Sequence, residues 1–132
     1  MVNSRRKGKA GENEVAGILS DLLGVRLTRN LNQSRDGGPD LVGLPGWAVE
    51  VKRGEKPEVP VWWAQAISQA GNDKPVLIYR ANRRSWRAII AVADCMPDFA
   101  NQSRFLFRFE TDLETFAMIV RNGWEDTRDK AT

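Results

Sequence analysis

The chain has 132 residues, of which 42% are hydrophobic and 28% are charged, and this length and composition predict one globular domain over residues 1–132. Its net charge is +3, and the positive excess lies within residues 1–110, which favours a polyanionic partner. It contains no histidine and a single cysteine, Cys95, so serine-histidine catalysis, histidine-ligated zinc and an internal disulfide framework are excluded.

The first predicted elements are a helix and a strand. Apolar residues at helical spacing predict a helix over residues 8–23, and Gly24 ends it. Alternating residues predict a strand over residues 25–31, and the polar residues 32–39, which include glycines, predict a loop. Glu12 lies in the first turns of the helix, so it could reach a sheet against which the helix packs.

A hairpin is predicted next. Residues 40–42 and residues 47–52 read as partner strands, and residues 44–46 form a short loop that would close them. If this loop is centred on Pro45, Asp40 lies opposite Glu50, and both carboxylates point to the same face of the sheet.

This opposed pair of carboxylates indicates a chemical role. Like charges that face each other destabilise a sheet, and a hard divalent cation such as Mg2+ removes that cost by binding carboxylate oxygens. Lys52 follows Glu50 on the same face, where it could activate water or stabilise charge on a phosphate. The alternative is an exposed hairpin face that carries a simple Glu-Lys pair. Because histidine is absent, an enzyme built from this chain must use carboxylates, lysine or a metal.

The rest of the chain predicts further alternation of helices and strands. The predicted elements are a helix over 61–70, strands over 75–79 and 86–92, a short helix over 94–100, a strand over 104–109 and a helix over 112–121. This order predicts an α/β fold with a mixed central sheet flanked by helices, in which the helix over 61–70 connects two parallel strands in a right-handed crossover.

Basic residues gather at two places. Arg5, Arg6, Lys7 and Lys9 open the chain. Arg80, Arg83, Arg84 and Arg87 surround Trp86 at a predicted turn, where they could bind phosphates while the indole stacks on an unpaired base. The alternative for both clusters is a solvated basic surface.

The charged residues resemble a known nuclease motif. Glu12, the pair Pro39-Asp40 and the run Glu50-Val51-Lys52 resemble, in this order, the signature of the PD-(D/E)xK nuclease superfamily. The resemblance implies a restriction-endonuclease-like core over about residues 5–92, which leaves residues 93–132 as an extension that carries a strand and a helix.

Further residues resemble one branch of that superfamily, the archaeal-type Holliday junction resolvases. The segment over residues 6–12 is similar to the start of those proteins. Arg29 and Ser34 correspond to a basic residue and a loop serine of the branch, and the segment over 61–66 is similar to its next helix, in which a glutamine, here Gln65, recurs.

The resemblance implies roles for individual residues. Mg2+ or Mn2+ would be bound by Asp40, Glu50, the main-chain carbonyl of Val51 and Glu12, the last directly or through water. Lys52 would orient the attacking water, and Gln65 would support that water or the scissile phosphate. The predicted DNA-binding residues are Arg5, Arg6, Lys7, Lys9, Arg29, Ser34, Arg35, Arg83 and Arg84.

The sequence is therefore compatible with three functions. The favoured one is a metal-dependent, homodimeric, structure-selective endonuclease that resolves Holliday junctions or other branched DNA. The second is a nicking or restriction-like endonuclease that acts on double-stranded DNA, and the third is a DNA-binding protein that does not cut. No apolar run approaches the roughly 18 residues of a membrane helix, so we expect a cytoplasmic protein without a membrane partner, in a prokaryotic cell or a virus-infected host.

Overall fold

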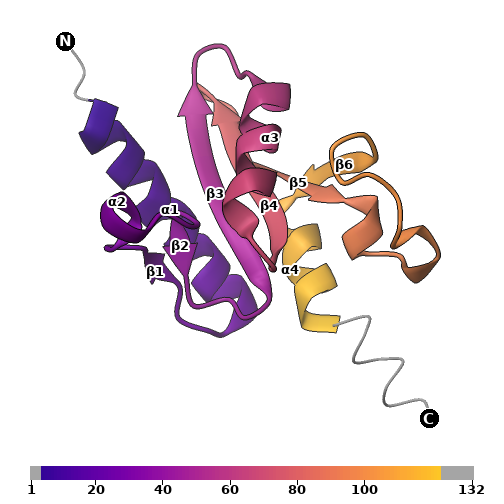
Figure 1. Cartoon of the computed structure of the whole chain (residues 1–132). Coiled ribbons are helices and arrows are strands. Elements are labelled where there is room, and N and C mark those ends of the chain that lie inside the picture. Colours follow the sequence, from indigo (N-terminus) through magenta and orange to yellow (C-terminus); the bar gives the residue numbers. More distant parts are fainter. Residues whose placement is uncertain (1–3, 123–132) are drawn as a thin grey trace.

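The structure is a computed structural model that describes residues 4–122, without the side chains of residues 4–7, 34 and 35. Within this range a sheet of six strands lies between helices (Figure 1). The strands are β1 (Thr28–Arg29), β2 (Leu41–Val42), β3 (Trp47–Gly54), β4 (Lys74–Ala81), β5 (Arg87–Ala91) and β6 (Arg108–Asp112). The helices are α1 (Ser4–Leu23), α2 (Gln33–Asp36), α3 (Val59–Ala70) and α4 (Leu113–Asn122), with two short 3-10 helices at Val92–Asp94 and Pro97–Phe99.

The sheet is mixed, as the element order predicts. Its strands lie in the order β1-β2-β3-β4-β5-β6; β3 and β4 are parallel, and the other neighbours are antiparallel. A parallel pair requires a crossover, and α3 supplies it between β3 and β4. The predicted α/β architecture with helices on both sides of a mixed sheet is confirmed.

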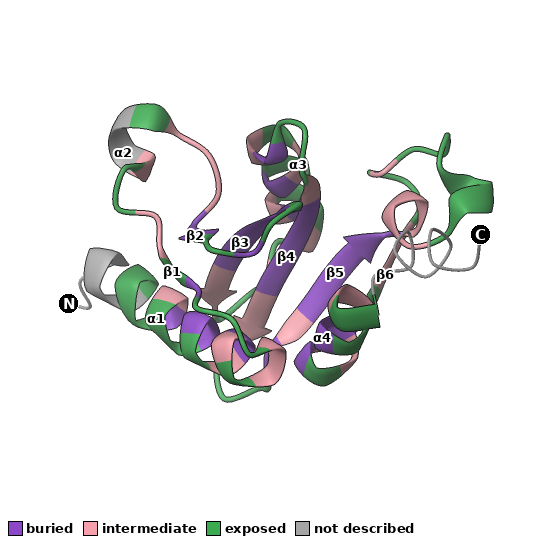
Figure 2. Ribbon diagram, turned by 90° about the horizontal axis from the view of Figure 1, so that it is seen from below, coloured by how far each residue is buried: buried purple, intermediate pink, exposed green. Residues whose placement is uncertain are grey.

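Two apolar clusters cover the two faces of the sheet. On one face α1 and α4 pack against the strands, with Val49 and Phe116 fully buried among them. On the other face Trp63 of α3 packs against Leu77 of β4, and both side chains are fully buried. Figure 2 shows the buried strands β3, β4 and β5 between these helical layers. The alternation of side chains along β3 therefore decides which helix each residue meets.

Several predicted boundaries differ from the structure. The first helix begins at Ser4 rather than at residue 8, and the short helix predicted over 94–100 is replaced by the two 3-10 helices Val92–Asp94 and Pro97–Phe99. The first strand is reduced to Thr28–Arg29. Before it the Leu27 N–H donates to the Ser20 hydroxyl at 2.9 Å, and after it the Asn30 side chain donates to the Pro39 carbonyl at 2.9 Å. The predicted loop over residues 32–39 contains the helical turn α2. The last strand begins at Arg108 rather than Arg104, because the Arg104 carbonyl accepts a hydrogen bond from the Trp63 indole at 3.0 Å and its guanidinium pairs with Asp94.

No helix within residues 4–122 has both the length and the apolar character needed to cross a membrane.

Candidate active site

The two carboxylates of the hairpin lie side by side in the structure. Leu41 pairs with Val49 in the register predicted around Pro45, and the Asp40 N–H donates to the Val49 carbonyl at 2.9 Å. Asp40 and Glu50 are the buried charged residues of the described chain, with 8% and 3% of their surface exposed. The exposed hairpin face considered as an alternative is therefore wrong for these two groups.

The Asp40 carboxylate is fixed where the short strand β2 begins. Its Oδ2 accepts the Val51 N–H at 2.8 Å, which a backbone carbonyl would accept in a longer strand. Its Oδ1 accepts a hydrogen bond from the Gln33 side-chain amide, which also donates to the Gly38 carbonyl at 3.1 Å. Asp40 thus ends the pairing of β2 with β3 and holds its carboxylate against the main chain of β3.

Burial makes Glu50 a weak acid. Desolvation, and next the neighbouring Asp40 carboxylate with which it shares a hydrogen bond, raise the pKa of Glu50 from 4.5 to about 9. Lys52 acts in the opposite direction, and Glu12 adds a smaller effect that raises this pKa. Within residues 4–122 the buried Oε1 of Glu50 has no hydrogen-bond donor. A buried, proton-binding oxygen without a partner is suited to a cation.

A cavity of about 410 Å3 opens beside this pair. It is lined by Gly8, Gly11, Glu12, Asp40, Val51, Lys52 and Arg53. The structure therefore brings four predicted site residues, Glu12, Asp40, Val51 and Lys52, to one cavity, with Glu50 buried beside Asp40. The two glycines are on α1, and Gly8 has open space where a Cβ would lie, so the helix leaves the cavity unfilled.

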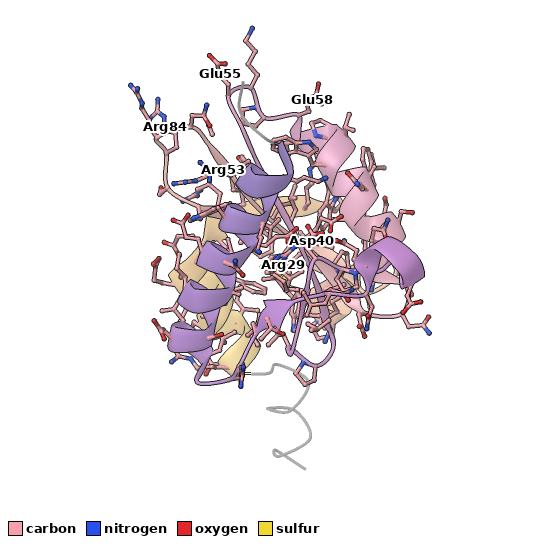
Figure 3. All side chains as sticks on the ribbon, turned by 90° about the vertical axis from the view of Figure 1, so that its left-hand side faces the viewer. Arg29, Asp40, Arg53, Glu55, Glu58 and Arg84 are labelled. Atoms are coloured by element: carbon pink, nitrogen blue, oxygen red, sulfur yellow. The ribbon has the colours of Figure 1, made fainter. Side chains whose placement is uncertain are left out.

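Glu12 and Arg29 form an ion pair at the rim. The Arg29 Nε lies 2.8 Å from Glu12 Oε1, and both side chains are mostly buried. Figure 3 shows Arg29 close to Asp40 in the view from the side of α1. Two residues that are 17 positions apart in the sequence, each predicted to act at the site, thus contact each other.

The backbone of Val51 faces Asp40 and the cavity. Within a strand the N–H and C=O of one residue point toward the same neighbouring strand. Because the Val51 N–H points to Asp40, its carbonyl oxygen also lies on the side of the hairpin and the cavity. This carbonyl can therefore act as an oxygen donor next to the two carboxylates.

Other predicted residues are not at the cavity. Gln65 is exposed on α3, Lys9 is exposed on α1, and Arg83 and Arg84 are exposed at the turn between β4 and β5. The side chains of Arg5, Arg6, Lys7, Ser34 and Arg35 lie outside the described part of the structure. Among the described residues no group of three or more acidic, histidine or cysteine side chains has the geometry to hold a metal ion.

Trp86 does not present a stacking surface. Only 7% of Trp86 is exposed, and the Arg80 guanidinium lies 4.9 Å from the centre of its ring. Arg80 also lies 3.6 Å from Glu14, and Arg87 pairs with Glu110 at 3.0 Å. The predicted stacking of Trp86 on a base is replaced by a cation-π contact within the protein.

Two glutamines that hold the site were not predicted. Gln33 contacts Asp40 directly, and Gln69 on α3 accepts the Gly38 N–H at 3.0 Å. Gln69 follows Gln65 by one helical turn, so the two side chains lie on the same side of α3. Nothing in the sequence near Gln33 distinguishes it from the other polar residues of its loop.

Comparison with known proteins identifies the family. A family model described as "Phage putative PDDEXK endonuclease" matches residues 3–131. Among solved structures, the chain is similar to Hjc, a Holliday junction resolvase of Archaeoglobus fulgidus, with 16% sequence identity, a TM-score of 0.45, and coverage of 85% of this chain and 88% of that chain. A search of curated proteins gives no significant match. Because the family model spans nearly the whole chain, the predicted PD-(D/E)xK membership is confirmed, and the chain belongs to this family of phage PDDEXK endonucleases.

Proposed function

We propose that this endonuclease is metal-dependent and structure-selective, and that it cuts branched DNA such as four-way junctions as a homodimer. The observation that carries the proposal is the buried pair of Asp40 and Glu50, in which Glu50 Oε1 has no donor among residues 4–122. Such a pair is costly in a protein that only binds DNA, whereas a hydrolase uses it.

The oxygen donors fit Mg2+ or Mn2+. A hard cation of this kind binds one or two carboxylates together with backbone oxygen, water and substrate phosphate. Asp40, Glu50 and the Val51 carbonyl would hold it, and Glu12 would contribute from α1, directly or through water. When bound, the ion would lower the pKa of a water molecule and offset the charge that develops on the phosphate.

The other residues position the reactants. Lys52 lies near enough to Glu50 to favour its charged form, and at the cavity its ammonium group would orient the attacking water or stabilise the phosphate. Arg29 holds Glu12 in place through their ion pair. We infer that Gln65, exposed on α3, supports the water or the scissile phosphate from the outside.

DNA would reach the cavity across the basic surface of the first helix and the loops around it. The residues proposed to bind it are Arg5, Arg6, Lys7, Lys9, Arg29, Ser34, Arg35, Arg83 and Arg84. A DNA substrate implies action in the cytoplasm of a prokaryotic cell or of a virus-infected host. Two subunits would supply paired cuts across a two-fold symmetric junction.

Cleavage assays separate the three functions. Purified protein is incubated with labelled four-way junction, linear duplex and single-stranded DNA, each with Mg2+ or with EDTA. Symmetric nicks in the junction alone, and only with Mg2+, support the proposal. Cleavage of linear duplex supports a restriction-like or nicking enzyme instead. DNA binding without any product under either condition supports a protein that does not cut.

Asp40→Asn tests the metal site itself. The amide keeps the size of the side chain but removes one of the two charges, so we expect cleavage to fall at least about a thousandfold while junction binding stays within about threefold. Asp21→Asn, at an exposed position of α1, is the matched control and should cut like the wild type. Full activity of Asp40→Asn would exclude this carboxylate from the reaction.

A further inference from the structure

Two arginines lie next to each other on the sheet, at the edge of the cavity. Arg53 of β3 is in register with Arg80 of β4, and both follow the alternation of Val51 and Ile78 onto the face covered by α1. Neighbouring strands are about 4.8 Å apart, and like charges at paired positions of two strands destabilise a sheet. An anion between or above them would remove this cost.

Three hydrogen-bond donors at this place are unused. The buried Nε atoms of Arg53 and Arg80 and the buried Nε1 of Trp86 have no acceptor within residues 4–122. These side chains gather under Gly11: a Cβ there would lie 3.2 Å from Arg53 Cδ and 3.5 Å from the Trp86 ring. Buried donors are nearly always satisfied in native proteins, so unused ones in a cluster indicate a ligand that accepts hydrogen bonds.

Residues of this cluster line both the active-site cavity and a second cavity. Arg53 lines the first cavity together with Asp40 and Lys52. The second, of about 520 Å3, is lined by Arg80, Arg84 and Trp86, among others. In the view of Figure 3, Arg53 lies between Asp40 and Arg84.

We propose that Arg53, Arg80 and Arg84, the arginine track, bind backbone phosphates of a DNA strand on one side of the scissile bond. The inference rests on the proposed function in taking DNA as the substrate, and it names the path that the strand follows. Guanidinium groups suit this task because they donate several hydrogen bonds to phosphate oxygens. Trp86 has a positioning role, because its ring holds the Arg80 guanidinium through the cation-π contact.

The acidic residues of the second cavity limit the path. Glu14 lies 3.6 Å from Arg80, and Asp112 and Glu114 also line the second cavity. These carboxylates repel a phosphate strand, so the strand passes along the rim formed by the arginine track. Arg87 is paired with Glu110 and is not part of the track.

Binding measurements test the track without any cleavage. Fluorescein-labelled duplex and four-way junction are titrated in EDTA and followed by fluorescence anisotropy. Arg84→Ala removes an exposed arginine of the track, and Arg26→Ala removes an exposed arginine beyond the far end of α1. We expect Arg84→Ala to weaken binding about tenfold and to reduce the slope of log K against log salt by about 0.9, because one phosphate contact is lost. Arg26→Ala should stay within about twofold of the wild type.

Neutral phosphates locate the contacts. Single methylphosphonates are placed along one strand of the junction, and affinity is measured for each position. Wild-type protein should lose affinity at positions on one side of the cut, and Arg84→Ala should no longer respond at one of them, as a thermodynamic cycle requires for a direct contact. Arg53→Lys and Arg80→Lys, which keep the charge but lose the guanidinium donors, should weaken binding, and circular dichroism checks that each variant is folded.

The outcomes distinguish this inference from the proposed function. If Arg84→Ala binds like Arg26→Ala and shows the wild-type methylphosphonate pattern, the track is overturned even if junctions are cut. If wild-type protein cuts no DNA with Mg2+ but the track variants show the expected losses, the proposed function fails and the track stands. Absence of any DNA binding by wild-type protein overturns both.

Discussion

At the scale of single residues, Glu50 links the proposed chemistry to stability. It is almost fully buried, its Oε1 has no donor among residues 4–122, and its pKa in the folded chain is raised to about 9. Folding therefore holds a proton on this carboxyl at pH values where the unfolded chain releases it. A cation and a proton compete for the same oxygen, so metal binding should be weaker at low pH.

The raised pKa of Glu50 fixes the sign with which the free energy of unfolding depends on pH. Between pH 4.5 and about 9 the folded chain binds more protons at Glu50 than the unfolded chain, so the free energy of unfolding falls as pH rises through this window. We expect thermal melts in EDTA to show this fall, by at most about 1.4 kcal/mol per pH unit. Glu50→Gln should flatten it, because an amide does not titrate, and Mg2+ should flatten it for the wild type.

Tyr79 does not interfere with this measurement. Burial and its hydrogen bond to Glu110 raise the pKa of Tyr79 to about 12, so it ionises above the window. Parallel pH slopes for wild type and Glu50→Gln would show that Glu50 is not the titrating group.

The charged residues of the site could be predicted from the sequence, whereas the residues that hold them in place could not. Asp40, Glu50 and Lys52 are unusual on strands, and their spacing alone places them together. Gln33 and Gln69 act through the tertiary arrangement: each reaches the backbone around Gly38 from a segment whose position depends on the packing of other elements. Amides in polar loops and on helix surfaces are common, so no local pattern marks these two.

At the scale of elements, the hairpin depends on a glycine at Gly43. Its φ is +113°, and a Cβ there would lie 2.2 Å from the backbone oxygen of Arg26. The close approach allows β2 to lie beside the segment that leads into β1, which positions Asp40 at the start of β2. No flexible side chain can move aside to relieve the clash.

Gly43→Ala should therefore destabilise the protein by about 3 kcal/mol in urea unfolding, since it adds backbone strain and displaces main chain. The matched control is Gly46→Ala in the same hairpin. Gly46 also has a positive φ, of +85°, but nothing lies within 4 Å of the added methyl group, so we expect a loss of about 1 kcal/mol. Equal losses for the two variants would mean that the contact with Arg26 is unimportant.

The same scale shows why some elements were predicted and others were not. The hairpin register follows from strict alternation and from a turn that Pro45 and Gly46 define, so it was predicted correctly. The start of the last strand was placed too early, because residues 104–107 have strand-like composition but Arg104 is held by Asp94 and by the Trp63 indole. Those partners lie 10 and 41 positions away, beyond the range of a local pattern.

At the scale of the whole molecule, the proposed cutting of a two-fold symmetric junction requires paired sites. We expect light scattering at the concentrations used for cleavage to give twice the 14.9 kDa of one chain. A dilution series is the control, because a weak dimer should lose mass and cleavage rate together. A mass of one chain with full junction cleavage would contradict paired cutting by a preformed dimer.

The contact between Gln69 and Gly38 also has a kinetic consequence. It joins residues 31 positions apart and requires α3 to have packed on the sheet, so it belongs to the slow, non-local part of folding. The loop that leads into Asp40 is therefore completed late. A refolding chain should regain helical circular dichroism first and nuclease activity only together with the fluorescence change that accompanies burial of its core tryptophans, Trp63 among them.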